Sequence, residues 1–285
     1  MKGVVTDIEA YKTRREQDRV APFESDRKVV RLSSDVAIGG KEICVIAGPC
    51  SIESEEQFLA VISSVKESGA KAIRGGIFKP RTSPYSFQGL GSTGFNILDN
   101  AKKTFGSPII SEVMDQRMLE EMAEHVDAFQ VGARNMYNYP LLKDLGRLNK
   151  PVLLKRSMMA TIEEFVGAAE YILSHGNSNV ILCERGIRSF DSNTRFCLDL
   201  AAISVLKEKL KQPIVVDPSH GTGVARYVEP MALAAIAAGA DGIMIEVHAT
   251  PEKALSDGKQ ALTFDAFRSL MLKLDKVSNA VGRSI

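Results

Sequence analysis

The chain has 285 residues, of which 45% are hydrophobic and 25% charged, and its formal net charge at pH 7 is +1. This length and composition are those of a globular protein large enough to form one α/β barrel. The near-neutral charge excludes a nucleic-acid footprint, and no apolar stretch reaches the length of a membrane span, so we expect neither nucleic acid nor membrane as a partner.

The N-terminal 28 residues are too charged for a secretory signal. The four cysteines lie in apolar contexts and lack the spacing of a disulfide framework. A reduced, cytoplasmic protein is therefore expected. We interpret three of the cysteines as inert residues inside strands or on a helix: Cys44, Cys183 and Cys197.

Residues 1–40 are predicted to form an N-terminal extension and a β-hairpin, and residues 41–285 the main domain. The polar segment 1–28 includes a short helical pattern over about 7–17. Two apolar stretches, 28–32 and 36–38, precede Gly39 and Gly40 and indicate the hairpin.

Eight short runs rich in Val and Ile follow, with little alternation, which is typical of parallel strands buried on both faces. They cover 43–47, 72–74, 108–113, 128–131, 152–155, 180–183, 214–216 and 242–245. Helical patterns lie between most of them, among them 55–68, 116–125, 161–174, 194–210 and 230–238.

This repetition predicts a (β/α)8 TIM barrel. A doubly wound open sheet is less favoured, because no run resembles an edge strand and no GxGxxG sequence follows the first run.

In such a barrel, chemistry belongs to the loops at the carboxyl ends of the strands. These ends carry a set of cations that we call the cation cluster: Arg74, Lys79, Arg134, Lys155 and Arg185. Because the chain is nearly neutral overall, their convergence indicates an anionic ligand with more than one phosphate or carboxylate group.

A second set of rim residues, called here the metal quartet, comprises Cys50, His220, Glu246 and Asp257. Taken singly, Cys50 is better explained as inert core and Asp257 as a solvated turn acid. Their joint position on the rim reverses that preference and predicts a site for Mn, Fe, Co or Zn. The role of His248, on the same rim, is left undecided.

Six motifs in this order resemble 3-deoxy-D-arabino-heptulosonate 7-phosphate (DAHP) synthase, type I beta branch, over residues 28–275. They are AGPCS at 47–51, KPRT at 79–82, GAR at 132–134, LKR at 154–156, DPSH at 217–220 and IEVH at 245–248. The alternative is the similar 3-deoxy-D-manno-octulosonate 8-phosphate synthase, which takes arabinose 5-phosphate. That family has a KANRSS-like segment where this chain has KPRTS, so Arg81 and Thr82 favour the four-carbon acceptor.

The resemblance implies a condensation of phosphoenolpyruvate with erythrose 4-phosphate to DAHP and phosphate, the first step of the shikimate pathway. It implies that the metal quartet binds the metal and that the cation cluster, with Ala133 beside Arg134, binds phosphoenolpyruvate. Arg81, Thr82 and Ser83 would position erythrose 4-phosphate. The catalytic residues would be Cys50 and His220, with Lys79 as a proton shuttle.

The resemblance also implies a homotetramer or homodimer, with residues 1–40 as the candidate interface. Members of this branch often carry an N-terminal regulatory domain or a fused chorismate mutase, whereas about forty residues precede the first barrel strand here. We therefore expect no feedback inhibition by an aromatic amino acid.

Two rival functions fit the same fold. One is a Schiff-base aldolase that uses Lys155 or Lys79 and needs no metal. The other is a non-catalytic phosphosugar-binding barrel, or a protein that acts chiefly as an assembly partner. The metal quartet argues against simple binding, because a binder needs no open Lewis-acid position.

Overall fold

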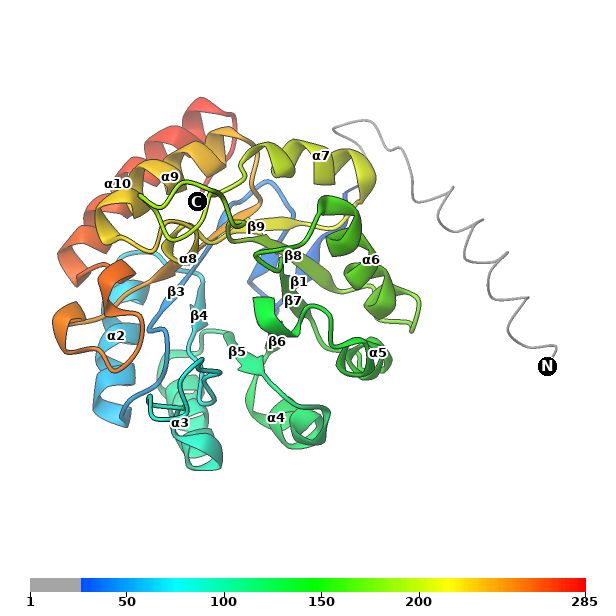
Figure 1. Cartoon of the computed structure of the whole chain (residues 1–285). Helices are drawn as coiled ribbons and strands as arrows, with labels where there is room; N and C mark the ends of the chain where they lie inside the picture. Colours follow the sequence, from blue (N-terminus) through cyan, green and yellow to red (C-terminus); the bar gives the residue numbers. More distant parts are fainter. Residues whose placement is uncertain (1–26) are drawn as a thin grey trace.

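The computed structural model describes residues 27–285, so the helix expected over 7–17 lies outside the described residues. Eight parallel strands form a closed barrel, and helices surround it (Figure 1). The barrel strands are β3 (Cys44–Gly48), β4 (Ala72–Arg74), β5 (Ile109–Val113), β6 (Ala128–Val131), β7 (Val152–Lys155), β8 (Val180–Glu184), β9 (Ile214–Val216) and β10 (Gly242–Glu246). The predicted TIM barrel is confirmed. The open sheet is excluded because β10 pairs with β3, with Gly242 opposite Cys44.

The α-helices are α2 (Glu55–Glu67), α3 (Phe95–Phe105), α4 (Leu119–His125), α5 (Tyr139–Arg147), α6 (Ile162–Leu173), α7 (Ala201–Lys209), the short buried α8 (Pro218–Thr222), α9 (Ala225–Ala237) and α10 (Phe264–Ala280). Short 3-10 turns are η1 (Gly91–Gly94), η2 (Gln116–Met118), η3 (Ala133–Asn135), η4 (Pro251–Lys253) and η5 (Gly258–Gln260). None of the helices in the described part of the chain is long and apolar enough to cross a membrane.

Alternation along the strands directs polar side chains to the mouth of the barrel. Ala72 belongs to the apolar cluster inside the barrel, and so does Leu153, whereas their neighbours pack in the outer cluster against the helices. Because strand side chains repeat with period two, Arg74 and Lys155 face the same way as these inner residues, one layer closer to the carboxyl ends. The barrel interior is thus apolar below and charged above.

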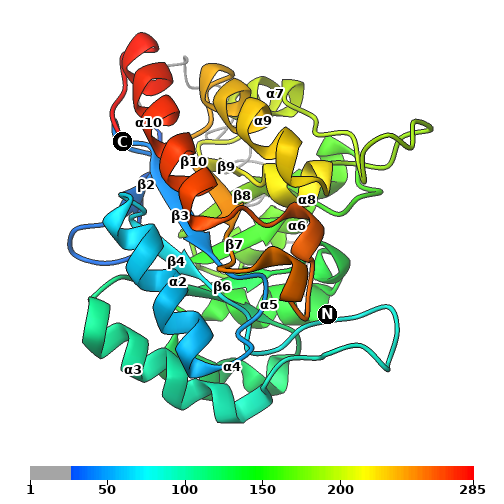
Figure 2. The same cartoon turned by 90° about the vertical axis from the view of Figure 1, so that its left-hand side faces the viewer.

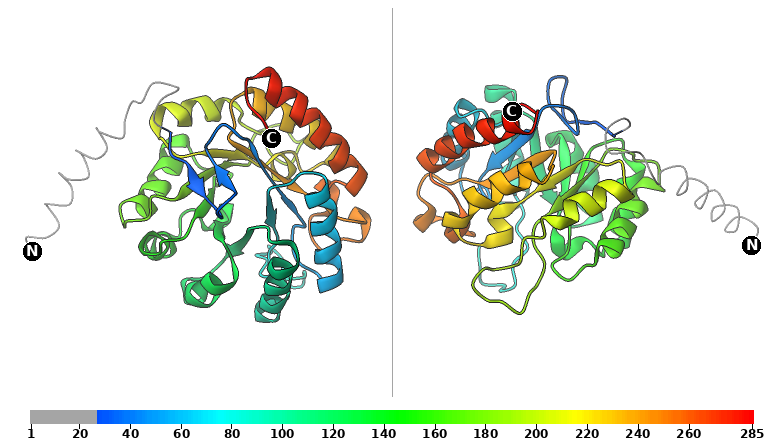
Figure 3. Two further views of the ribbon diagram at one scale, coloured as in Figure 1. Left: turned by 180° about the vertical axis from the view of Figure 1, so that it is seen from behind. Right: turned by 90° about the horizontal axis from the view of Figure 1, so that it is seen from above.

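The amino-terminal end of the barrel is covered by the predicted hairpin. Strands β1 (Val30–Arg31) and β2 (Ala37–Ile38) pair antiparallel, with Val30 opposite Ile38. Val30, Leu32 and Ile38 join the apolar cluster of the barrel interior, and Figure 3 shows the hairpin in blue against this end. The opposite end is left for the site.

The helix predicted over 194–210 is wrong in its first part, because α7 begins only at Ala201. The preceding residues form a loop whose backbone N–H groups bond to distant carbonyls, as Arg195 does to Thr222 and Cys197 to Ile187. Cys197 is exposed, so its assignment to a buried strand or helix is also wrong. Figure 2 shows this loop, in yellow-green, projecting on the same side as the cyan loop that follows β4.

The helix predicted over 230–238 begins earlier than expected, at Ala225, and contains Pro230 in its interior. Proline is favoured at the start of a helix, which is why the sequence pattern predicted the helix to begin there. In the interior of α9 it removes one backbone hydrogen bond. Burial of Val228, Ala232 and Ile236 on the same helix offsets this loss.

The predictions for 55–68 and 161–174 agree with α2 and α6 to within a residue at each end. Ser54 caps α2, and Thr161 forms a capping box with Glu164 at α6. The pattern over 116–125 divides into η2 and α4.

Candidate active site

A cavity of about 280 Å³ opens at the carboxyl ends of the barrel strands. All the side chains expected to bind substrate line it: Arg74, Lys79, Arg81, Thr82, Ser83, Ala133, Arg134, Lys155 and Arg185. His220 and Asp257 form part of the same wall. The fold therefore brings the two predicted sets of residues into contact around one space.

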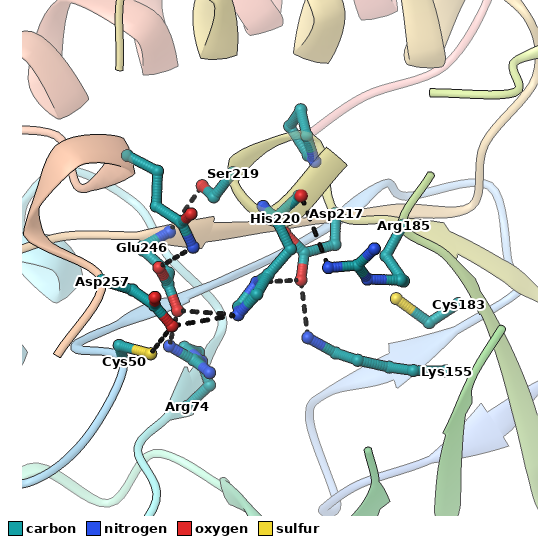
Figure 4. A network of polar contacts seen from close by, with 12 residues as sticks. Cys50, Arg74, Lys155, Cys183, Arg185, Asp217, Ser219, His220, Glu246 and Asp257 are labelled. Carbon is teal, nitrogen blue, oxygen red and sulfur yellow. Dashed lines mark hydrogen bonds and ion pairs between the residues drawn. The ribbon is translucent and has the colours of Figure 1, made fainter. Parts of the chain in front are cut away.

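The metal quartet converges from four separate segments: the loop after β3, helix α8, the end of β10 and the residue before η5. One ligand atom from each residue lies within 4.8 Å of the others. Cys50 Sγ is 3.2 Å from Asp257 Oδ2, and His220 Nε2 is 3.4 Å from Glu246 Oε1. Figure 4 shows these side chains pointing toward one another.

The orientation of His220 fits a metal ligand. Its Nδ1 lies 2.8 Å from Asp217 Oδ2, so the carboxylate accepts the ring proton there and Nε2 presents its lone pair to the quartet. Burial lowers the pKa of His220 to about 4. The ring is therefore neutral at physiological pH, as metal coordination requires.

Glu246 is fixed by partners on both oxygens. Arg74 Nη1 donates to Oε1 at 2.7 Å, and Gln260 Nε2 donates to Oε2 at 2.6 Å. Burial alone would raise the pKa of Glu246, but His220 and Arg74 outweigh it and lower that pKa. The group is thus held as an oriented carboxylate. One sulfur, one nitrogen and two carboxylates fit a divalent transition metal.

Asp257 has a left-handed backbone, with φ 46° and ψ 33°, and it is the single non-glycine residue with positive φ in the part of the chain that the structure describes. A backbone of this kind costs free energy and persists where its surroundings hold it. Burial opposes ionisation of Asp257, yet Lys79 and His220 hold the pKa of its carboxyl below the usual range.

Lys79 connects the metal quartet to the cavity. Its Nζ lies 2.6 Å from Cys50 Sγ and 3.3 Å from Asp257 Oδ2. Burial alone would lower the pKa of Lys79, but Cys50 and Glu246 outweigh it and raise that pKa, so the side chain is cationic. Burial, with Glu246 nearby, raises the pKa of Cys50 to about 12.

Two further members of the cation cluster, Lys155 and Arg185, are held by specific contacts. Lys155 Nζ pairs with Asp217 Oδ2 at 2.6 Å, and the guanidinium of Arg185 lies 4.2 Å from the ring centre of Phe196 (Figure 4 shows Lys155 and Arg185). Arg81 Nη1 and Arg74 Nε are buried donors without a hydrogen-bond partner among residues 27–285. Because buried donors are almost always paired in folded proteins, these two indicate a ligand that supplies oxygen acceptors.

Arg156, from the LKR motif, and His248 have their ion-pair partners outside the metal quartet. Arg156 is buried and pairs with buried Glu184 and partly exposed Asp199. His248 Nδ1 accepts from the backbone N–H of Thr250 at 3.0 Å, while its Nε2 lies 3.6 Å from Glu53.

The residues that the sequence analysis missed include three with informative positions: Gln130, Arg195 and Gln260. Gln130 lines the cavity, and the period of β6 places it two residues after inward-facing Ala128. Arg195 also lines the cavity and lies 3.6 Å from Asp257 Oδ1, but the wrong helix prediction over 194–210 concealed it. Gln260 follows Asp257 by three residues, and no sequence signal distinguished it.

Comparisons with known proteins agree with one another. The family model described as "DAHP synthetase I family" matches residues 23–282. A curated protein of Thermotoga maritima, phospho-2-dehydro-3-deoxyheptonate aldolase, is 48% identical over 260 residues, which are 91% of this chain and 77% of that protein. A 2-dehydro-3-deoxyphosphooctonate aldolase of Syntrophotalea carbinolica is 32% identical and is matched over 85% of this chain and 93% of its own.

Two solved structures are also similar. The crystal structure of DAHP synthase from Thermotoga maritima superposes with a TM-score of 0.88 at 47% identity, covering 91% of this chain and 76% of that one. A truncated form of the 3-deoxy-D-arabino-heptulosonate 7-phosphate synthase from the same organism gives a TM-score of 0.86 at 42% identity, covering 95% and 98%.

Proposed function

The chain belongs to the DAHP synthetase I family and is a 3-deoxy-7-phosphoheptulonate synthase of aromatic amino acid biosynthesis, and from that premise we propose a metal-dependent condensation of phosphoenolpyruvate with erythrose 4-phosphate in this cavity. The observation that carries the proposal is the position of Lys79. This side chain lines the cation-rich cavity and also contacts two residues of the metal quartet, Cys50 and Asp257. In this reaction C3 of phosphoenolpyruvate bonds to the aldehyde carbon, water adds to C2, and phosphate leaves.

The cation cluster binds phosphoenolpyruvate in this proposal. A carboxylate and a phosphate on a three-carbon molecule need several cations at fixed positions, and Lys155 and Arg185 are already held in place by Asp217 and Phe196. Neutralising both anionic substrates lets them approach to bonding distance, which is a large part of the catalytic effect in such reactions.

Arg81, Thr82 and Ser83 position erythrose 4-phosphate. They lie on the loop after β4 and face the same cavity as the cation cluster. The unpaired Nη1 of Arg81 supports a contact with the phosphate group, since an acceptor oxygen there would satisfy a buried donor.

A divalent cation held by the metal quartet would supply Lewis acidity next to the reacting aldehyde and water. Lys79 supplies the proton for the alkoxide oxygen that forms when the aldehyde carbon is attacked. Its position between Cys50 Sγ and the cavity supports this role, and its raised pKa keeps the proton on Nζ until that oxygen forms.

The Schiff-base alternative has little support. A lysine nucleophile must be neutral to attack a carbonyl. Lys155 is ion-paired with Asp217 at 2.6 Å, and the pKa of Lys79 is raised rather than lowered.

The test is phosphate release from phosphoenolpyruvate with erythrose 4-phosphate or arabinose 5-phosphate as acceptor, with and without chelator and added Mn²⁺. We expect chelator-sensitive release with erythrose 4-phosphate alone. Release with arabinose 5-phosphate alone would instead indicate octulosonate synthesis. Full release in chelator with erythrose 4-phosphate would contradict the metal requirement while leaving the substrate assignment intact.

A further inference from the structure

Two loops that carry members of the metal quartet are joined by a buried serine pair. Ser51 Oγ and Ser256 Oγ lie 2.6 Å apart, although 205 positions separate them in the chain. The two residues are 1% and 4% exposed. Ser51 directly follows Cys50, and Ser256 directly precedes Asp257, so one hydrogen bond connects the neighbours of two candidate ligands.

Ser51 is the fixed side of this pair. Its backbone bridges to Gly76 in parallel register, and the next backbone N–H, that of Ile52, donates to the Gly76 carbonyl at 2.9 Å. The segment after β3 is thereby tied to the segment after β4. A hydroxyl mounted on it can serve as a rigid reference point for a less regular loop.

Ser256 belongs to the less regular loop, in which the backbone of Asp257 requires stabilising contacts. Its left-handed backbone is costly for a non-glycine residue, and it lies in a loop between two short 3-10 turns, η4 and η5. A second contact supports the same loop from outside, where Glu53 Oε1 accepts from the backbone N–H of Leu255 at 2.8 Å. The loop is therefore attached to the β3 segment at both Leu255 and Ser256.

We propose that Ser51 and Ser256 are positioning residues for the metal ligands Cys50 and Asp257, and that their hydrogen bond increases the affinity of the site for a divalent cation. The bond sets the approach of Cys50 Sγ to Asp257 Oδ2, which are 3.2 Å apart. The inference rests on the proposed metal site. Neither serine lines the cavity, so the effect acts through the two ligands.

A neutral hydroxyl pair suits this position. The quartet already contains two carboxylates and a sulfur that must lose its proton on metal binding. A charged pair at Ser51 and Ser256 would change the electrostatic potential at the metal, whereas two hydroxyls fix geometry without adding charge.

The experiment measures Co²⁺ binding to the full-length, chelator-stripped protein by the thiolate-to-cobalt charge-transfer absorption, with no substrate present. The variants are Ser51→Ala, Ser256→Ala and the double variant. We expect each single change to weaken Co²⁺ binding about tenfold, as is typical for partners of metal ligands. The double variant should bind no more weakly than the singles, because both residues act through one bond.

Ser278→Ala is the matched control. Ser278 is fully buried and donates one hydrogen bond, from Oγ to the Asp275 carbonyl at 2.8 Å, on α10 away from the quartet. It should lower the midpoint of thermal unfolding without changing Co²⁺ affinity. The double variant also controls for destabilisation of the fold in the single variants. Each single change leaves one buried hydroxyl without its partner, whereas the double change removes both hydroxyls.

Unchanged Co²⁺ affinity in the serine variants, with lowered thermal stability alone, would show that the pair is merely structural and overturn the inference. Additive losses in the double variant would also overturn it. If the wild-type protein itself shows no charge-transfer band, the proposed metal site is wrong, and this inference falls with it.

Discussion

Lys79 Nζ and Cys50 Sγ are 2.6 Å apart, so a cation that lines the cavity contacts the sulfur of the metal quartet. The contact joins residues from the segments that follow two neighbouring strands, β3 and β4. It places a proton donor beside a candidate Lewis-acid site. Substitutions can therefore distinguish proton transfer by Lys79 from metal binding by the quartet.

Lys79→Met should lower kcat by about 10²- to 10⁴-fold, because it removes a general acid but leaves all four quartet residues in place. Co²⁺ titration and steady-state phosphate release measure the two effects. The control is Lys259→Met. Lys259 lies on η5, two residues after Asp257, and this variant should retain turnover. Loss of Co²⁺ binding together with turnover would mean that Lys79 serves the metal site rather than proton transfer.

Cys50→Ala should abolish the cobalt charge-transfer band and the chelator-sensitive turnover, since it removes the single sulfur of the quartet. Cys183→Ala is a close control, because Cys183 is a fully buried cysteine inside the same barrel. It should keep both signals. Persistence of turnover in Cys50→Ala would refute a catalytic metal at this site.

Arg81→Ala and Arg134→Ala should separate the two substrates. We expect the KM for erythrose 4-phosphate to rise at least about tenfold in Arg81→Ala, because a charge-assisted contact with a phosphate is lost. Arg134→Ala should instead raise the KM for phosphoenolpyruvate. Initial rates with each substrate varied in turn provide the measurement, and an exchange of the two effects would reverse the assignment of the substrate subsites.

Gly258→Ala should weaken metal binding by displacing Asp257. A Cβ at Gly258 would lie 2.1 Å from the backbone carbonyl oxygen of Pro251, so the loop has to shift. Gly167→Ala, in α6 with open space around the added atom, should bind metal normally and be stabilised by about 0.5–1 kcal/mol. Equal Co²⁺ affinity in the two variants would show that the loop tolerates the shift.

The buried Lys207 predicts a pH dependence of stability at the opposite end of the barrel. Burial lowers the pKa of Lys207 even though Asp241 lies 3.0 Å away. The folded protein therefore releases this proton at lower pH than the unfolded chain, whose lysines titrate near about 10.4. Between those two pKa values the unfolded state binds more protons, so the contribution of Lys207 to stability rises with pH.

Urea unfolding midpoints of the wild type and of Lys207→Met, measured from pH 8 to pH 10.5, test this sign. The wild type should gain stability relative to the variant as the pH rises. A difference that stays constant, or that shrinks, would contradict the lowered pKa.

Much of the barrel was predictable because its information is local. Runs of Val and Ile with little alternation indicate strands buried on both faces, and the period of two then directs Arg74 and Lys155 to the mouth. The predicted helix boundaries were wrong where long-range contacts outweighed the local helix propensity, as in the loop before Ala201 and around Pro230. There the backbone bonds and side-chain packing that decide the outcome come from residues distant in sequence.

The sequence by itself determined the closed barrel and the convergence of Arg74, Lys155 and Glu246 at its mouth, because these residues end strands and strand ends in a barrel meet at one rim. Only the tertiary structure decided which loop residues approach them: Lys79 and Asp257 beside Cys50, Gln260 on Glu246, and Ser256 on Ser51. The physical reason is range. A strand is recognised from the pattern of neighbouring residues. The hydrogen bond between Ser51 and Ser256 spans 205 positions and forms only after the loops have packed.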